Sequence, residues 1–162
     1  MDFSHLDNKG NARMVDVSEK TATVREARAE GRIFMKSGTL RAVMDGSMPK
    51  GDVLAAARIA GIMAAKRTNE LIPMCHNIPL DSVKVDLVPD LEGNCIKITA
   101  SVRCIWKTGV EMEALTAVSV AALTVYDMCK SLDKTMVIGD MMLVWKSGGK
   151  SGDFKRTKGE DE

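Results

Sequence analysis

The chain has 162 residues, of which 45% are hydrophobic and 28% charged, and its formal net charge is +1. This length and composition fit one globular domain that spans residues 1–162. A net charge this close to zero gives no overall field that would draw the protein onto nucleic acid or an anionic membrane, so neither partner is expected.

The cysteines and the N-terminus indicate a reduced, cytoplasmic protein. Cys75, Cys95, Cys104 and Cys129 form no C-x-x-C pair, and only Cys75 has a histidine beside it, so metal-site spacing is absent. Residues 1–16 lack the apolar core of a signal peptide, and no uninterrupted apolar run approaches the roughly 20 residues that span a bilayer. We therefore expect cytoplasmic localisation and no protein-bound metal.

The first third of the chain predicts an irregular segment, a strand and a short helix. Residues 1–20 are polar and expected to be irregular. Residues 21–35 mix threonine and valine with arginine and alanine, which is compatible with a strand, although their helix propensity is not negligible. A short helix is expected at residues 39–46, where Gly46 ends it.

A long helix is expected between Asp52, which can cap its N-terminus, and Pro73, which cannot continue its backbone hydrogen bonds. Alanine is its main residue, and Arg58 is the only charge between Asp52 and Lys66. A helix this apolar and with side chains this small must be packed on more than one face.

The second half of the chain predicts three strands and another long helix. Apolar and polar residues alternate in 82–89 and in 94–106, which predicts two half-buried strands joined as a hairpin. Residues 109–134 predict the second long helix, in which 114–126 carry no charge. Residues 135–146 are apolar on nearly both faces, as in a central strand.

The elements follow the order βαββαβ. This is the ferredoxin-like arrangement of the α+β class, an antiparallel sheet with two long helices on one face. Residues 147–162 are rich in glycine and then in charge, and are expected to form a mobile tail. Because one sheet face stays uncovered and the helices are largely uncharged, an obligate homo-oligomer is expected.

His76 is the one histidine outside the polar N-terminal segment, and Pro73 and Pro79 brace its loop. An ordinary histidine exchanges protons near about pH 6.5, so a rigidly held one suits acid–base chemistry. A lone histidine is also often structural. The residues by themselves leave both roles open.

Asp127 and Lys130 are three residues apart near the end of the second long helix, and therefore share a face. Their attraction favours the charged form of each, so Lys130 is better suited to an acid or charge-stabilising role and Asp127 to a base. The alternative is an exposed ion pair worth under about 1 kcal/mol.

Glu111 and Glu113 begin the same helix, where the helix dipole alone would favour acidic residues. Glu113 and Asp127 are 14 residues apart, which at about 1.5 Å per residue is roughly 21 Å. One small ligand cannot easily touch both ends. If both ends contribute to one site, two chains must form it.

Lysines at loop positions offer local anion binding: Lys50 precedes the first long helix, and Lys146 and Lys150 flank glycines in "KSGGKSG". A P-loop would need glycine at Val144, so this segment is not one. It could still close over phosphates through backbone amides and lysines, or serve only as a solubilising tail.

Four segments together resemble the MoaC family of molybdenum cofactor biosynthesis: "MVDVSEK", "KGDVLAAARIAGIMAAKRTNELIPMCHNIPL", "KTGVEMEALTAVSVAALTVYDMCK" and "KSGGKSG". The resemblance runs from about Phe3 to Phe154. It implies ferredoxin-like subunits in a hexamer, a trimer of dimers, with active sites between subunits. It also implies an enzyme that converts a cyclised dihydro-GTP into cyclic pyranopterin monophosphate and releases pyrophosphate.

The resemblance implies site residues as well. The catalytic carboxylate of the family falls on Asp127, which is expected to act as a general base. Its basic partners, Lys50 and Lys130, are expected to donate protons and to stabilise negative charge. Lys146 is expected to contact phosphate. No resident cofactor is implied, although Mg²⁺ could accompany the triphosphate. The substrate-binding positions fall on Met74, Cys75, His76, Met112 and Glu113, with Arg25, Glu111 and Lys146 as further members of the pocket.

The sequence departs from the family pattern in one loop. The expected "LIPLCHPLPL" reads "LIPMCHNIPL", so Met74, Asn77 and Ile78 differ while Cys75 and His76 are unchanged. Loss of the middle proline makes the loop slightly less stiff.

Two other functions fit the pattern: a non-catalytic nucleotide-binding or regulatory module, and a scaffold for the radical enzyme that makes the substrate. Fold alone does not decide between them and an enzyme. The joint presence of His76, Asp127, Lys130 and Lys50 favours the enzyme, because a binding module needs no acid–base set.

Overall fold

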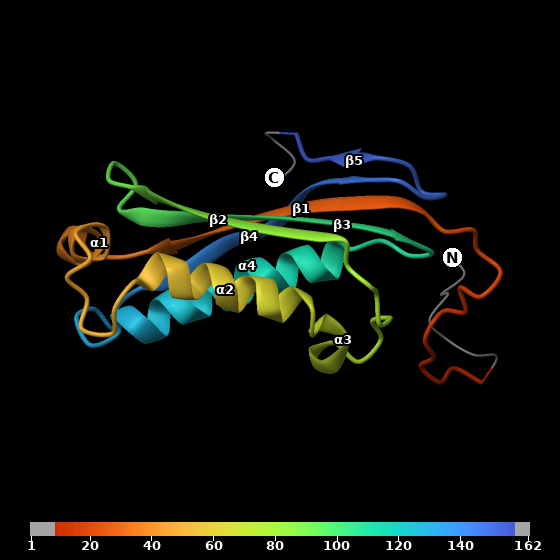
Figure 1. Cartoon of the computed structure of the whole chain (residues 1–162), viewed down its shortest axis with the longest axis horizontal. Coiled ribbons are helices and arrows are strands. Elements are labelled where there is room, and N and C mark those ends of the chain that lie inside the picture. The colour runs from red at the N-terminus through yellow and green to blue at the C-terminus, as the bar shows by residue number, and fades with distance from the viewer. Residues whose placement is uncertain (1–8, 158–162) are drawn as a thin grey trace.

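The protein consists of one antiparallel sheet with helices packed against one face (Figure 1). The structure, a computed structural model, describes residues 9–157. In chain order its elements are β1 (Thr23–Phe34), α1 (Ser37–Met44), α2 (Val53–Ala65), α3 (Thr68–Leu71), β2 (Ser82–Asp90), β3 (Cys95–Trp106), α4 (Glu111–Cys129), β4 (Val137–Ser147) and β5 (Phe154–Lys155).

The strand order is β2-β3-β1-β4-β5, with every neighbouring pair antiparallel. The predicted ferredoxin-like α+β fold is confirmed, and the strand expected within residues 21–35 is β1 (Thr23–Phe34), not a helix. β1 pairs with β3 along its whole length, from Thr23 opposite Trp106 to Phe34 opposite Cys95. Alternation along both strands directs one row of apolar side chains to the helical layer and a charged row to the other face.

The two long helices, α2 and α4, cross on the same face of the sheet (Figure 1). Gly61 of α2 lies at their contact: a Cβ added there would be 2.9 Å from the carbonyl oxygen of Ala117 and 3.3 Å from the Cβ of Ala121. Small residues let the two backbones approach closely. α2 packs on β2 as well as on α4, but Ile59 and Met63 on its outer side are exposed, so packing of that side stays a prediction.

The first long helix begins as its sequence predicts but ends earlier. The Asp52 side chain accepts a hydrogen bond of 2.9 Å from the backbone N–H of Ala55, which satisfies one free donor of the first turn of α2. α2 ends at Ala65, and the separate short helix α3 continues toward Pro73.

α4 is long and apolar enough, by length and composition, to cross a membrane. More than half of it is nevertheless buried, against the sheet and α2. The core helix of a globular protein meets the same test, and the position of α4 in Figure 1 is that of a core element.

The C-terminal segment differs from the expected tail. Its glycines turn the chain back so that β5 pairs with β4 and becomes the edge strand, with Lys146 opposite Phe154. The Asp153 carboxylate accepts a hydrogen bond of 3.2 Å from the Gly148 amide inside this turn. The last five residues of the expected tail, and the first eight of the polar N-terminal segment, lie outside the described residues.

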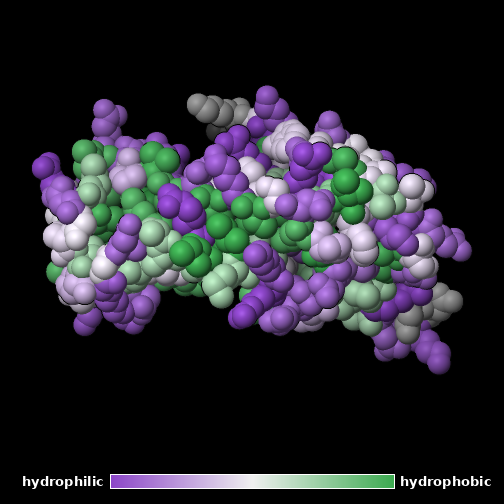
Figure 2. Space-filling model, in the orientation of Figure 1, coloured by the Kyte–Doolittle hydropathy of each residue, from purple (hydrophilic) through white to green (hydrophobic). Residues whose placement is uncertain are grey.

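The helical layer also exposes apolar side chains. Figure 2 shows apolar residues interrupting the polar surface over α2 and the strand beside it. The exposed large apolar residues of the two long helices are Ile59, Met63, Met112 and Leu123. Neither helix is fully covered by the fold of one chain.

Candidate active site

Eight of the eleven predicted site residues gather around the N-terminal end of α4, where they line two adjoining clefts. The first, here called the cationic cleft, is lined by Arg25, Glu111 and Lys146 together with Lys20, Lys107 and Lys150. The second, called the histidine cleft, is lined by Met74, Cys75, His76, Met112 and Glu113. Lys20 and Glu111 line both, so the two clefts adjoin.

Glu111 and Lys146 form the border of the cationic cleft. The Lys146 Nζ lies 3.3 Å from a Glu111 carboxylate oxygen and donates a hydrogen bond of 2.9 Å to the Ser151 hydroxyl. Gly109 precedes α4, and a side chain there would collide with the Glu111 carboxylate. The glycine therefore leaves room for Glu111 to fold back toward Lys146.

Glu113 is almost fully buried in the histidine cleft, with 3% of its surface exposed. Burial raises the pKa of its carboxyl to about 7, and the nearby charge of Glu111 adds to this. At neutral pH both protonation states are populated, so Glu113 can donate or accept a hydrogen bond. Burial, with a contribution from Glu113, also raises the pKa of the Cys75 thiol, which argues against a thiolate nucleophile.

His76 is held by the N-terminal segment. Its Nε2 lies 2.8 Å from the backbone oxygen of Val15, and because a carbonyl only accepts, Nε2 bears the proton. The Lys107 ammonium donates a hydrogen bond of 2.6 Å to the Ser18 carbonyl nearby. Residues 15–20 therefore form part of the clefts, a role that their polar composition did not reveal.

Arg25 acts as a brace between strands. Its guanidinium donates to three backbone oxygens, those of Trp106 at 3.4 Å, Lys107 at 3.4 Å and Gly148 at 3.3 Å. Gly149, which follows Gly148, has a φ of +86°, and a Cβ there would collide with the Arg25 guanidinium. Glycine is required because the "KSGGKSG" turn packs directly on the arginine.

The other three predicted residues, Lys50, Asp127 and Lys130, form an ion-paired cluster at the C-terminal end of α4, here called the charged trio. The Lys130 Nζ lies 2.6 Å from Asp127 Oδ1, and the Lys50 Nζ lies 2.8 Å from Oδ2. The Lys50 ammonium also donates to the Asp127 backbone oxygen at 3.1 Å. Lys50 reaches this position from the turn between α1 and α2.

Each carboxylate oxygen of Asp127 accepts one ammonium hydrogen bond. The bonds from Lys130 and Lys50 lower the pKa of Asp127 to about 2. The bond to Asp127 also raises the pKa of Lys130 above its usual value. All three side chains are about half exposed, so solvent screens these attractions.

The structure keeps the two groups of residues apart within one chain. The clefts lie at the first turn of α4 and the charged trio at its last turn, and α4 runs along the sheet between them (Figure 1). This is the separation that the spacing of Glu113 and Asp127 predicts. A site that uses both ends needs groups from a second chain.

Comparison with known proteins decides the family. The model of the MoaC family matches residues 14–149, most of the chain. The chain belongs to the MoaC family.

Relatives named cyclic pyranopterin monophosphate synthase cover almost the whole chain. The chain is 61% identical to the protein of Chloroflexus aggregans over 95% of this chain and 93% of that one. It is 56% identical to the protein of Clostridium acetobutylicum over 95% and 96%, respectively. The match to cyclic pyranopterin monophosphate synthase 1 of Mycobacterium tuberculosis is 57% over 96% and 91%.

The sequence did not single out Glu19, Lys20, Lys107 or the Val15 carbonyl, which also belong to the clefts of this MoaC family member. Lys107 directly precedes the "TGVEME" segment that begins α4, which was the available signal. Among residues 9–157, no three His, Cys, Asp or Glu side chains are grouped so that they could hold a metal ion.

Proposed function

We propose that the chain is a cyclic pyranopterin monophosphate synthase. It would convert 3′,8-cyclo-7,8-dihydro-GTP into cyclic pyranopterin monophosphate and release pyrophosphate, an early step of molybdenum cofactor biosynthesis. The single observation behind this proposal is the identity of about 60% to synthases over about 95% of the chain.

The cationic cleft suits a triphosphate. Two carboxylates, Glu19 and Glu111, face a larger set of cations there: Lys20, Arg25, Lys107, Lys146 and Lys150. Pyrophosphate departure needs positive charge fixed in advance, because a preorganised charge stabilises the leaving group without rearrangement. Lys146, half-buried and oriented by Glu111 and Ser151, is the cation best placed to contact a phosphate.

The charged trio supplies proton transfer. Lys130 bears its proton firmly at neutral pH, which suits an acid or a stabiliser of developing negative charge. With a pKa of about 2, Asp127 is a weak base while both ammonium groups hold it. An anionic substrate would compete for Lys50 and Lys130, and this would raise the pKa of Asp127 toward the range where it accepts a proton.

The functional unit is expected to be an oligomer, a hexamer built as a trimer of dimers. Two features support this proposal: the site groups lie at opposite ends of α4, and Ile59, Met63 and Leu123 expose apolar surface on the helical layer. We place the enzyme in the cytoplasm and assign it no resident cofactor. Mg²⁺ would enter mainly with the triphosphate.

The rival function is a non-catalytic nucleotide-binding or regulatory module. Such a module would use the cationic cleft but has no need of the charged trio. The two functions therefore differ in whether a bound nucleotide is turned over.

A turnover assay separates them. Purified protein receives the cyclised dihydro-GTP, and pyrophosphate and cyclic pyranopterin monophosphate are followed together, with Asp127→Asn assayed in parallel. The synthase should form both products and the variant neither. Tight binding of the substrate without pyrophosphate release would refute the synthase and leave the binding module.

A further inference from the structure

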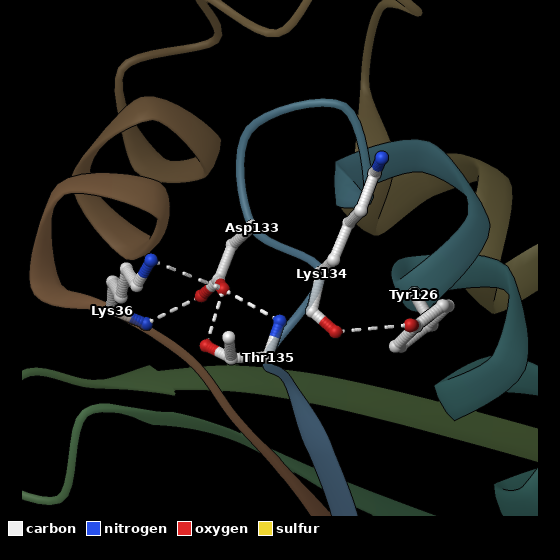
Figure 3. A network of polar contacts seen from close by, with 5 residues as sticks. All are labelled: Lys36, Tyr126, Asp133, Lys134 and Thr135. Atoms are coloured by element: carbon white, nitrogen blue, oxygen red, sulfur yellow. Dashed lines mark hydrogen bonds and ion pairs between the residues drawn. The ribbon is translucent and has the colours of Figure 1, made fainter.

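Asp133 lies three residues beyond Lys130, and its side chain is fully buried. Figure 3 shows its polar contacts. A buried carboxylate is costly unless several donors satisfy it. Asp133 accepts hydrogen bonds from the backbone N–H of Lys36 at 2.9 Å, the N–H of Thr135 at 2.9 Å and the Thr135 hydroxyl at 2.7 Å. These donors, that of Lys36 first, lower the pKa of Asp133, so it stays ionised.

The contacts of Asp133 join three elements. Its own N–H donates to the Cys129 oxygen at 3.1 Å, which ties it to the last turn of α4. Its carboxylate reaches Lys36, the residue just before α1, and Thr135, which leads into β4. Beside it, the Tyr126 hydroxyl donates to the Lys134 oxygen at 3.2 Å (Figure 3). The turn that follows Lys130 is therefore fixed on both sides.

The same contacts extend toward Lys50. Lys36 directly precedes α1, and the turn after that helix is closed by a bond of 3.0 Å from the Ser47 N–H to the Ala42 oxygen. Met48 is then buried in the core, two residues before Lys50. A displacement of Lys36 would be transmitted through this bonded segment to the Lys50 ammonium.

We propose that Asp133 is a positioning residue for the charged trio. Its buried carboxylate fixes the end of α4, which bears Asp127 and Lys130, against the start of the segment that bears Lys50. It touches none of the three side chains and has no chemical role. The turnover readout of this inference rests on the proposed function.

Asp133→Asn tests the inference, because the amide keeps the size but replaces one acceptor oxygen with a donor. This donor faces either the Lys36 N–H, which bonds Oδ2, or the Thr135 N–H and hydroxyl, which bond Oδ1. We expect kcat to fall between about 10- and 100-fold with KM within about twofold, since small displacements of catalytic groups have effects of that size. Asp90→Asn is the matched control. Asp90 accepts hydrogen bonds of 3.1 Å from the Glu92 and Gly93 amides in the β2–β3 hairpin. The Asp90→Asn substitution should therefore lower stability but leave kcat and KM unchanged.

A second readout needs no substrate. The pKa of Lys130 can be measured by NMR of ¹³C-labelled lysine. It should fall toward its usual value in Asp133→Asn, because the ion pair between Lys130 and Asp127 becomes looser. Tyr126 and Lys50 are the other titratable groups around this ion pair. If wild-type protein shows no turnover, the proposed function fails while this shift still tests the positioning role.

An unchanged kcat and an unchanged Lys130 pKa, with only a lower melting temperature, would overturn the inference and make Asp133 a fold stabiliser. If Asp133→Asn does not fold, Thr135→Val replaces it, because this variant removes only the hydroxyl donor and retains the backbone bond. In Thr135→Val we expect a several-fold loss of kcat and again a fall in the Lys130 pKa. Wild-type values of both quantities would overturn the inference. Lys36→Met, which removes an exposed ammonium 3.9 Å from the carboxylate, should stay within about twofold of wild type because exposed ion pairs contribute little.

Discussion

At the scale of single residues, three carboxylates show how surroundings set chemical state. Asp127 is exposed and bonded to two ammonium groups, so its pKa falls to about 2. Glu113 is buried, so its pKa rises to about 7. Asp133 is also buried, yet its pKa is lowered because backbone amides and a hydroxyl bond its charged form. Burial alone therefore does not decide whether a carboxylate ionises; the donors around it do.

Glu113 makes stability depend on pH. Its folded pKa of about 7 lies above the usual 4.5, so the unfolded chain loses this proton first and the folded state loses stability as pH rises from 4.5 through 7. The full loss, present above pH 7, is about 3 kcal/mol. The free energy of unfolding, measured in urea at pH 5 and pH 8, should show this loss in the wild-type protein but not in Glu113→Gln. Exposed Glu92→Gln is the control, and equal pH dependence in all three chains would contradict the assignment.

Lys130 is predicted to be needed for chemistry and not for folding. Its ammonium is half exposed, so Lys130→Ala removes little packing and should leave the circular dichroism and melting temperature close to wild type. Turnover should fall at least about 100-fold, the contribution usual for a positioned acid–base group. Lys134→Ala, on the next turn, provides the matched control because only its backbone oxygen is bonded. Wild-type turnover in folded Lys130→Ala would refute the role.

At the scale of elements, the close contact between α2 and α4 decides how the helical layer is built. Gly61→Ala should destabilise the protein by about 1–3 kcal/mol, because the added methyl meets the backbone oxygen of Ala117 and the helices must move apart. Gly38→Ala in α1 is the control: nothing lies within 4 Å of the added Cβ, so helix propensity should give a gain of up to about 1 kcal/mol. Thermal unfolding measures both, and equal effects would contradict the packing account.

The hydrophobic pattern predicted the long elements because each has apolar surface to bury. β3 alternates from Ile96 to Trp106, and α4 lacks charge where it packs between sheet and α2. β5 was not predicted, since two residues, Phe154–Lys155, show no period. That strand forms because the edge of β4 offers unpaired backbone groups and the glycine turn brings the chain back.

The site was predictable only in part. The pairing of Lys50 with Asp127 joins residues 77 apart, and spacing along one chain gives no sign of it; the family resemblance suggested it. The hydrogen bond between His76 and the Val15 oxygen, over 61 residues, was missed because a backbone oxygen leaves no trace in the residue pattern. Arg25 lines the cationic cleft, but its bonds to three backbone carbonyls could be found only from the fold.

At the scale of the whole molecule, the proposed function requires one active site to be assembled from two chains. The clefts and the charged trio lie at opposite ends of α4, which no rearrangement of single side chains would bring together. The cationic cleft of one chain would then face the trio of another, and the exposed apolar residues of α2 and α4 offer surface for that contact.

Subunit complementation tests this claim most directly. Asp127→Asn damages only the trio and Lys146→Ala only the cleft, so each variant alone should be inactive. Co-expressed in equal amounts, the two chains should recover about a quarter of wild-type turnover, because random assembly of a symmetric oligomer pairs an intact cleft with an intact trio at one site in four. Co-assembled chains that stay as inactive as the single variants would show that each site lies within one chain, and would refute the two-chain site.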